Sequence, residues 1–252
     1  MDRSKDSRGT DMKGTVFVAG ATGVIGTSLV RQLVEGGWRV FGSTRNPQRA
    51  AALRQAGAEA LIVDVFDAPA LNAALALAQP DVVAHQLTDL PSERTPQSLS
   101  AAIERNARLR REGTRNLIQA TLASGCRRMV AQSIAWAYAP GPLPHQETDP
   151  LDALATGERA VSVHAVQELE SLVLNSQGLD GVVLRYGRLY GPRTWSEAPE
   201  AEMPLYVEDA ARAALCAVER PGITGVFNVS EPCPQLSIEK AQQMLGWAPG
   251  VR

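Results

Sequence analysis

The chain has 252 residues, a formal net charge of -2 and 44% apolar residues, as expected for a globular protein of one large domain or one domain with a small appendage. This balance argues against a nucleic-acid partner, and the apolar runs are too short to span a membrane. Cys126, Cys216 and Cys233 are too widely spaced for a disulfide framework or a metal cluster. We therefore expect a cytoplasmic protein with no metal site.

The order of apolar segments predicts the fold class. Residues 1–13 are polar, lack the apolar core of a signal peptide and are expected to be a disordered leader. After them, strand-like runs at 15–20, 38–43, 60–65, 81–86, 128–133, 181–187 and 225–230 alternate with helical patterns, notably at 24–35, 68–78, 99–124, 158–177 and 207–218. This alternation predicts an α/β fold, a Rossmann-like doubly wound parallel sheet of about seven strands that binds ligands at the carboxyl ends of the strands.

Three glycines follow the first expected strand in the segment "VFVAGATGVIG". Gly20, Gly23 and Gly26 are spaced G-x-x-G-x-x-G at a turn from strand to helix. Glycine lets the backbone turn tightly and approach a pyrophosphate, and the helix N-terminus offers unpaired N–H groups and a favourable dipole. Because the motif lies in a βαβ unit of the right length, it predicts a dinucleotide site in preference to a plain glycine turn.

The end of the second strand indicates which dinucleotide is bound. NAD sites place an acid there, roughly 20 residues after the loop, whereas NADP sites place an arginine. The sequence reads "FGSTRNPQR", which offers Ser43, Thr44, Arg45 and Arg49 but no acid. An arginine with neighbouring hydroxyls suits a 2′-phosphate, so NADP(H) is the predicted cofactor and NAD(H) the second choice. The plainer interpretation of Arg45 is a solvated loop arginine.

Several further segments resemble one family. They are "GATGVIG", "DVVAHQ", "REGTRNLIQA", "SIAWAYAPG", "LRYGRLYGP", "YVEDAARAAL" and "FNVSE", which extend in order over nearly all of Gly14 to Trp247. Together they resemble the extended short-chain dehydrogenases/reductases of the NAD(P)-dependent epimerase/dehydratase family. The resemblance implies a Rossmann domain over 14–186 with a return of 205–230, and abbreviated substrate-binding elements within 187–252. It also implies a homodimer built on the helices near 99–124 and 158–177.

The resemblance also implies which residues contact the cofactor. They lie on the glycine loop and at the ends of the strands: Gly20, Thr22, Gly23, Val24, Ile25, Gly26, Ser43, Thr44, Arg45, Asp64, Val65, Gln86, Leu87 and Tyr186. Asp64 could hydrogen-bond the adenine amine, but it could equally cap the helix that follows. Asn106 matches the family's helix asparagine.

The family's proton relay is absent. In that family a Ser or Thr at the end of the fifth strand works with a Tyr-x-x-x-Lys pair on the next helix. The first of these positions falls at or next to Ile134, with Ser133 as its neighbour. There is no lysine between Lys13 and Lys240, so the tyrosine–lysine couple is missing whatever the alignment.

Two alignments of the helix "ERAVSVHAVQELESLVL" remain open. If the family's glutamate is matched to Glu168, Ala160 takes the tyrosine position and His164 the lysine position. A shift by two residues places Ser162 and Val166 there instead. In the first register the face with His164 would look at the nicotinamide, and a neutral imidazole could serve as general acid or base.

The candidate catalytic residues are therefore His164, Tyr138 and Ser133. Each has a plainer interpretation: His164 as part of an exposed pair with Glu168, and Tyr138 as a core or loop tyrosine. If either carries a proton, activity should titrate near neutral pH. Arg188 and Arg193 are candidates for binding an anionic or carbonyl-bearing substrate, with a surface ion pair as the alternative.

Three functions compete at this point. The first is an NADP(H)-dependent oxidoreductase or epimerase that acts on a small carbonyl, hydroxyl or sugar-like substrate with an unusual proton donor. The second is a non-catalytic NADP(H)-sensing protein, and the third is a redox-neutral cyclase or lyase that keeps the cofactor for structure. The partners expected are a small-molecule substrate and a second copy of the chain, with no nucleic acid and no membrane.

Overall fold

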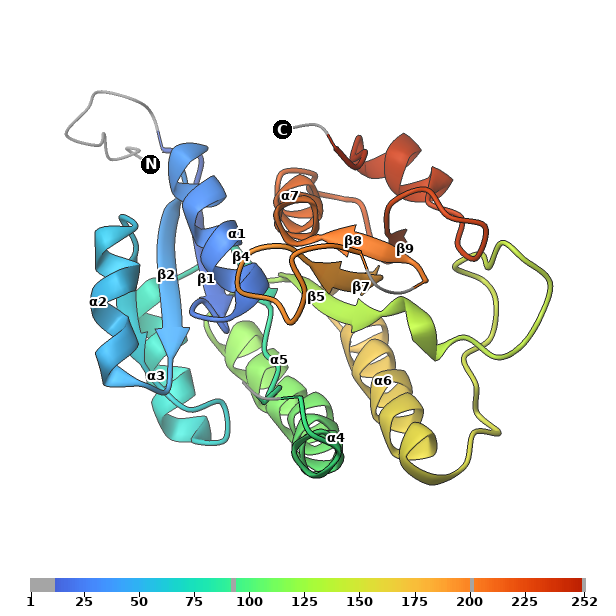
Figure 1. Ribbon diagram of the computed structural model, residues 1–252. Coiled ribbons are helices and arrows are strands. Elements are labelled where there is room, and N and C mark those ends of the chain that lie inside the picture. The colour runs from blue at the N-terminus through green and yellow to red at the C-terminus, as the bar shows by residue number, and fades with distance from the viewer. Residues whose placement is uncertain (1–11, 92–93, 200–201, 251–252) are drawn as a thin grey trace.

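A seven-stranded parallel sheet forms the centre of the computed structural model, which describes residues 12–91, 94–199 and 202–250. The strand order is β3-β2-β1-β4-β5-β6-β9, and every neighbouring pair is parallel (Figure 1). The strands are β1 (Thr15–Ala19), β2 (Arg39–Thr44), β3 (Glu59–Ile62), β4 (Val82–His85), β5 (Arg128–Ile134), β6 (Asp180–Tyr186) and β9 (Gly225–Val229). The predicted Rossmann-like, doubly wound sheet is confirmed. Most of the leader expected at 1–13 lies outside the described residues.

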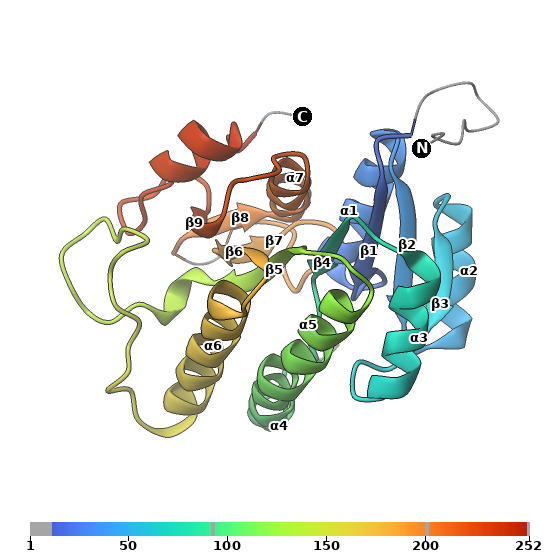
Figure 2. The same ribbon diagram turned by 180° about the vertical axis from the view of Figure 1, so that it is seen from behind.

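Helices cover both faces of this sheet (Figures 1 and 2). One layer contains α1 (Val24–Glu35), α2 (Pro47–Gln55) and α7 (Val207–Val218); the other contains α3 (Ala68–Ala78), α5 (Thr114–Ala123) and α6 (Gly157–Asn175). Because the strands are covered on both sides, consecutive side chains of β1 such as Val16 and Phe17 are both fully buried. Among the described residues, no helix is long and apolar enough to cross a membrane.

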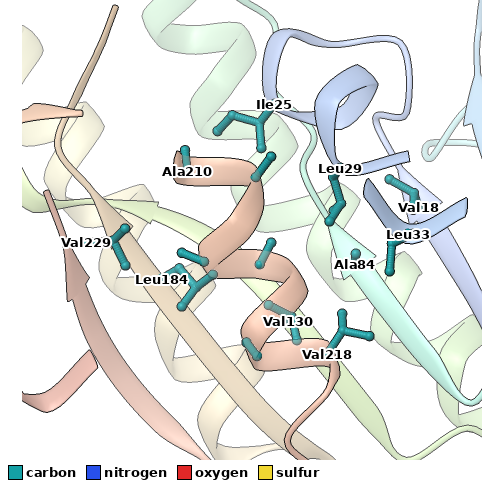
Figure 3. Close-up of a cluster of buried hydrophobic side chains, with 14 of the residues drawn as sticks. Val18, Ile25, Leu29, Leu33, Ala84, Val130, Leu184, Ala210, Val218 and Val229 are labelled. Atoms are coloured by element: carbon teal, nitrogen blue, oxygen red, sulfur yellow. The ribbon is translucent and has the colours of Figure 1, made fainter. Parts of the chain in front are cut away.

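Small residues bring α7 close to the sheet and to α1. Five alanines of α7 have no exposed surface, and the close-up shows α7 beside Ile25, Leu29 and Leu33 of α1 and above Val130 and Leu184 of the sheet (Figure 3). Alanine adds little bulk, so the helix axis can approach its neighbours closely. The amino end of α1, where the glycine loop lies, is thereby fixed relative to the central strands.

The helix expected over 99–124 is not a single α-helix. It begins earlier, as α4 (Pro96–Arg108), because Thr95 and Ser98 cap its first turn reciprocally. A wider turn with π-helical bonding, η1 (Leu109–Gly113), then joins α4 to α5. α4 packs beside α6, the other helix of the expected dimer interface, and the dimer stays a prediction.

The segment after β6 holds structure that the sequence did not predict. The sequence pattern predicts no strand between residues 188 and 206, but β7 (Arg188–Tyr190) and β8 (Pro204–Tyr206) pair there in parallel as a small second sheet. Strands of three residues are too short to show a periodic pattern. This small sheet begins directly at the carboxyl end of β6, so it holds Arg188 close to the edge where ligands are expected.

A buried arginine joins α7 to the sheet. The guanidinium of Arg128, at the start of β5, donates to the carbonyl oxygens of Ala217, Arg220 and Ile223 at 2.7–2.9 Å. Burial lowers the pKa of Arg128 from its ordinary value. The end of α7 and the turn after it therefore depend on this one side chain.

We predict that Arg128→Met lowers the free energy of unfolding by about 2–4 kcal/mol, because three carbonyl oxygens lose their donor. Urea denaturation measures the change. The matched control is Arg127→Met, since Arg127 is exposed and bonds only the nearby carbonyls of Leu122 and Cys126. The control should cost less than about 1 kcal/mol. Equal losses in the two variants would contradict the assignment.

Candidate active site

The glycine loop between β1 and α1 has no room for side chains. Gly20 has a φ of +84°, and a Cβ there would lie 2.6 Å from the carbonyl oxygen of Gln86. A Cβ on Gly26 would lie 2.1 Å from the carbonyl oxygen of Gly20. The loop therefore needs glycine at both positions, and its bare backbone can approach a ligand closely. The first turn of α1 contains no acidic residue, so nothing in it opposes an anion.

Two buried polar side chains beside this loop have no partner. Gln86, just after β4, and Tyr186, at the end of β6, are each 3% exposed. Neither atom of the Gln86 amide nor the Tyr186 hydroxyl makes a hydrogen bond within the described part of the chain. Burial raises the pKa of Tyr186, and the nearby Gln86 amide opposes part of this rise. The amide and the hydroxyl do not meet the geometry of a hydrogen bond. Unsatisfied buried groups are costly, so the pair fits a ligand that carries an amide, such as nicotinamide.

The end of β2 presents an arginine to solvent. Ser43 and Thr44 are buried, and the Thr44 hydroxyl lies 3.3 Å from that of Thr22 on the glycine loop. Arg45 is 56% exposed, and its guanidinium comes no closer than 3.8 Å to the carboxylate of Asp89. Such an exposed ion pair is weak. Among the described residues, Arg45 therefore has no strong ion pair.

The expected cofactor residues at the ends of β3 and β4 also have structural partners. A carboxylate oxygen of Asp64 accepts the backbone N–H of Phe66, while Asp67 caps α3, so Asp64 shapes the turn and does not cap the helix. Val65 is buried, and the carbonyl oxygen of Leu87 accepts a hydrogen bond from Gln132. Val24 and Ile25 begin α1 and pack in the core.

His85, at the end of β4, is a structural residue. Burial lowers its pKa to about 4, so its ring is neutral at physiological pH. Nδ1 accepts the N–H of Leu87, so we assign the ring proton to Nε2, which donates to the hydroxyl of Thr114 at 2.9 Å. The ring thus ties the chain after β4 to the start of α5.

Ser133 and Tyr138 belong to a buried hydrogen-bonded network (the Arg185 network) that contains Arg185, Glu170, Ser133, Tyr138 and Asn228. Arg185 of β6 makes two bonds with the carboxylate of Glu170 at 2.6 and 2.9 Å, and Ser133 donates to the same carboxylate at 2.7 Å. Arg185 also donates to the Tyr138 hydroxyl at 2.7 Å, which in turn donates to the Asn228 side chain at 2.7 Å. All five residues are buried.

The environment of Tyr138 keeps its phenol protonated. Burial raises its pKa, although the positive charge of Arg185 opposes the rise. Its hydroxyl proton is already donated to Asn228, and its ring is stacked on that of His145 with centroids 4.8 Å apart. The structure therefore holds Tyr138 and Ser133 as parts of the scaffold, and it does not present either as a free proton donor.

His164 lies apart from these groups. It is exposed on α6, and its nearest polar contact is the carbonyl oxygen of Ala153 at 3.3 Å. The residues of α6 that pack against the chain after β5 are Val163 and Val166, next to the buried Ser162. Burial thus favours the register in which Ser162 and Val166 occupy the tyrosine and lysine positions. The face with His164, expected to look at the nicotinamide, points to solvent instead.

The two arginines proposed for substrate binding are not brought together. Arg188 is exposed at the start of β7, with its guanidinium carbon 5.6 Å from the centroid of the Trp136 ring. Arg193 instead reaches back over the glycine loop and donates to the Thr27 hydroxyl at 2.6 Å and to the Thr22 carbonyl oxygen at 3.2 Å. Its contacts place the guanidinium of Arg193 beside the glycine loop.

Sequence reasoning missed two buried residues of this region, Glu170 and Asn228, and the half-buried Arg110. Glu170 was passed over in favour of Glu168, and Asn228 carried no local signal because its partner Tyr138 is 90 residues away. Arg110 carried no signal in the sequence that set it apart from the neighbouring arginines of the segment 105–115. It lies against α6, 3.5 Å from the Ser162 carbonyl oxygen, and burial of its guanidinium lowers its pKa to about 10 although part of the residue stays accessible.

A surface depression elsewhere does not belong to this site. It has a volume of about 540 Å³ and is lined by residues that include Lys13, Asp81 and Arg128. These residues lie at the amino ends of the strands, the edge opposite to the glycine loop, and an ion pair between Lys13 and Glu219 borders it. Among the described residues, no cluster of histidine, cysteine or acidic side chains could hold a metal ion.

Comparison with known proteins decides the family. The model of the NAD dependent epimerase/dehydratase family matches residues 16–205. The chain belongs to this family. Its members are enzymes that bind NAD(P), and the chain is an oxidoreductase or epimerase of the extended short-chain dehydrogenase/reductase type.

Two named relatives carry different activities within this family. A 3-diazoavenalumate denitrifying reductase from a Streptomyces species is 42% identical, over 87% of this chain and 77% of that protein. A UDP-N-acetyl-alpha-D-glucosaminuronate decarboxylase from Bacillus cytotoxicus is 26% identical, over 81% of this chain and 62% of that protein.

Solved structures share the fold. A UDP-glucose 4-epimerase from Thermotoga maritima, solved with UDP-glucose, has a TM-score of 0.76 and 21% identity, with 94% of each chain covered. The Bordetella bronchiseptica enzyme WbmG, solved with NAD, has a TM-score of 0.73 and 19% identity, over 98% of this chain and 91% of that chain. At this identity the likeness concerns the fold.

We predict that Glu170→Gln lowers the free energy of unfolding by about 3–5 kcal/mol, because Arg185 is left with an unneutralised buried charge. The side chains of both residues are about 6–7% exposed. Thermal or urea unfolding measures the loss. Glu168→Gln, two residues away on the exposed face, is the control and should change stability by less than about 0.5 kcal/mol. A stable Glu170→Gln variant would show that the ion pair is dispensable.

Proposed function

We propose that this protein is an NADP(H)-dependent reductase that adds a hydride to a strongly electrophilic carbon and supplies no proton of its own. The observation that carries the proposal is the composition of the face of α6 toward the end of β5. In the register favoured by burial, Ser162 and Val166 occupy the positions of the family's tyrosine and lysine. His164 is exposed, and the hydroxyl of Tyr138 is held by Arg185 and Asn228.

Reactions that move a proton fit this site poorly. Reduction of a carbonyl produces an alkoxide that must be protonated, and oxidation of a sugar hydroxyl requires a base. A positioned acid or base typically contributes about 10²–10⁴-fold to such steps. A reaction that takes up a hydride and no proton is not slowed by the absence of a proton relay.

Reductive removal of a diazonium group is such a reaction. The Streptomyces relative is named as a denitrifying reductase of a diazo compound, which supports this substrate class here. The carbon–nitrogen bond breaks, its electron pair leaves with dinitrogen, and the hydride electron pair forms a carbon–hydrogen bond. A cation and a hydride thus give a neutral arene and N₂, with no proton taken up or released. An aromatic carbon is required, because alkyl diazonium ions lose nitrogen at once in water.

The residues at the carboxyl edge of the sheet fit the dinucleotide. When bound, reduced nicotinamide supplies the hydride. The glycine loop and the start of α1 would hold the pyrophosphate, Arg45 the 2′-phosphate, and Gln86 with Tyr186 the carboxamide that satisfies their buried polar atoms.

Arg193 supports the same assignment. It has a φ of +66° and lies beside the positive end of α1, where no acidic residue of the described ranges pairs with it. A cation in that place is stabilised when an anion binds between it and the loop. We therefore assign Arg193 to the cofactor pyrophosphate instead of to the substrate.

We expect the protein to convert 4-carboxybenzenediazonium and NADPH into benzoate and N₂. With NADPH that carries two deuterium atoms at C4 of nicotinamide, in ordinary water, the benzoate should contain one deuterium, because the hydrogen comes from the cofactor alone. Mass spectrometry of the benzoate measures this, and the reaction without protein sets the background. Hydrogen drawn from water, or no turnover above background, would refute the proposal. If the protein binds NADPH tightly but does not turn over the diazonium compound, the result would favour an NADP(H) sensor. If it converts UDP-glucose to UDP-galactose, the result would favour an epimerase.

The pH profile of the same assay separates this proposal from one that depends on His164. With no titrating group in the reaction, the rate should stay level between about pH 6 and pH 8, where a histidine would titrate. His164→Ala should keep the rate of the unchanged protein. A rate that follows a group near neutrality and is lost in His164→Ala would instead establish the histidine as proton carrier.

We predict separate roles for the two cofactor arginines. Arg45→Ala should weaken NADPH and 2′-AMP binding about ten- to a hundredfold while NADH binding is unchanged, because one charge-assisted phosphate contact is lost. Arg193→Ala should weaken NADPH and NADH alike and leave 2′-AMP, which has no pyrophosphate, unaffected. Fluorescence titration and competition measure the affinities. Arg54→Ala is the control, since Arg54 is exposed in the last turn of α2, away from the end of β2. Identical patterns in the first two variants would contradict both assignments.

A further inference from the structure

An arginine and a tryptophan meet at the ligand edge of the sheet. Trp136 lies in the short turn η2 (Ala135–Ala137) that follows β5, and Arg188 follows β6. β5 and β6 are paired neighbours, with Ile134 opposite Tyr186 at their last residues. The two side chains therefore leave adjacent carboxyl ends, and the guanidinium carbon of Arg188 lies 5.6 Å from the centroid of the Trp136 ring.

The side-chain N–H groups of Arg188 are available to a ligand. It is exposed, and its side chain makes no hydrogen bond or ion pair with any residue within the described ranges. Arg185, three residues earlier, differs completely, since its guanidinium is held by Glu170 and Tyr138. An arginine that rests on an aromatic ring keeps its N–H groups available for a planar anion such as a carboxylate.

Trp136 is held firmly in place. Its carbonyl oxygen accepts from Arg159 at 3.0 Å, and Arg159 also bonds the carbonyl oxygen of Tyr138 and the carboxylate of Asp152. The half-buried ring packs at the margin of the apolar cluster that contains Val163. A ring fixed in this way loses little entropy when a ligand binds beside it.

The surroundings of the pair are apolar. Ile134 stands where the family has its serine or threonine, Val166 stands at the lysine position, and both belong to or border the same cluster as Trp136. Met203 also belongs to this cluster, and its carbonyl oxygen accepts a hydrogen bond from the backbone N–H of Arg188 at 2.7 Å. The hydroxyl groups of a sugar would find no hydrogen-bond partner on these apolar side chains, whereas a flat aromatic ring needs none.

From these observations we propose that Trp136 and Arg188 form a recognition site for an aromatic carboxylic acid, with the ring of the acid against Trp136 and its carboxylate on Arg188. This inference rests on the proposed function, because it specifies the substrate class of the same site. It implies that the substrate is an aromatic diazonium compound that also carries a carboxylate. It also implies that nucleotide sugars are not substrates of this protein.

Binding to the holoprotein tests the site without any turnover. The probe is 4-hydroxycinnamate, titrated into the NADP⁺ complex by calorimetry, with its neutral methyl ester as the matched ligand. We expect the acid to bind about ten- to a hundredfold more tightly than the ester, as one charge-assisted contact provides. Arg188→Gln should abolish this preference by weakening the acid and leaving the ester unchanged. Trp136→Leu should weaken both ligands, and Trp136→Phe should restore most of the affinity.

A second exposed arginine–tryptophan pair provides the control. The guanidinium carbon of Arg94 lies 5.5 Å from the ring centroid of Trp195. Arg94→Gln should leave both affinities unchanged, and unaltered NADPH binding and thermal unfolding should show that Arg188→Gln is folded. Equal binding of acid and ester, or loss of the preference in Arg94→Gln instead of Arg188→Gln, overturns the proposal.

Failure of this proposal and failure of the proposed function give different results. If the acid binds through Arg188 but no diazonium compound is reduced, the recognition site stands and the reductase does not. If benzenediazonium, which has no carboxylate, is reduced with the same KM as its 4-carboxy derivative, the reductase stands and the recognition site does not.

Discussion

The buried ion pair between Arg185 and Glu170 is the interaction on which the site depends. It joins β6 to α6, and Ser133 extends it to β5, so three elements share one carboxylate. Burial alone would lower the pKa of Arg185, but the bonds and charge of Glu170 outweigh burial and raise it. The pair also fixes the rotation of α6 about its axis. With Glu170 turned inward, Val163 and Val166 face the chain after β5 and His164 faces solvent.

This arrangement agrees with the proposal that the chain keeps the family's fold without a tyrosine–lysine proton relay. Val163 and Val166 of α6 contribute apolar packing toward the chain after β5, while the Arg185 network supplies the polar connections that hold β5, α6 and β9 together. The hydrogen bonds that hold α6 in place therefore come from residues other than those at the proposed tyrosine and lysine positions. The chemistry of the site can change by substitution along one face of a helix without disturbing the bonds that keep that helix in place.

Much of the fold could be predicted, because long apolar runs, a glycine loop and helix stop signals are local features of the chain. The register of α6 could not be fixed, since Glu168 and Glu170 look alike in sequence and only burial separates them. The partners of Tyr138 and the reach of Arg193 to Thr22 join residues far apart in the chain, with no local pattern to reveal them. β7 and β8 are too short to be periodic, so the surroundings of Arg188 emerged only in three dimensions.

The crowding around Gly26 has an evolutionary consequence. A methyl group there would stand 2.1 Å from the carbonyl oxygen of Gly20, so even the smallest change to an L side chain forces the backbone to move. Descendants of this chain should therefore keep the glycine loop whatever reaction they perform, while the buried Ser162 and Val166 can be replaced by other side chains that fit the same space. The glycine loop therefore identifies sequences that share this fold. To tell their reactions apart, one must compare the residues on the inward face of α6.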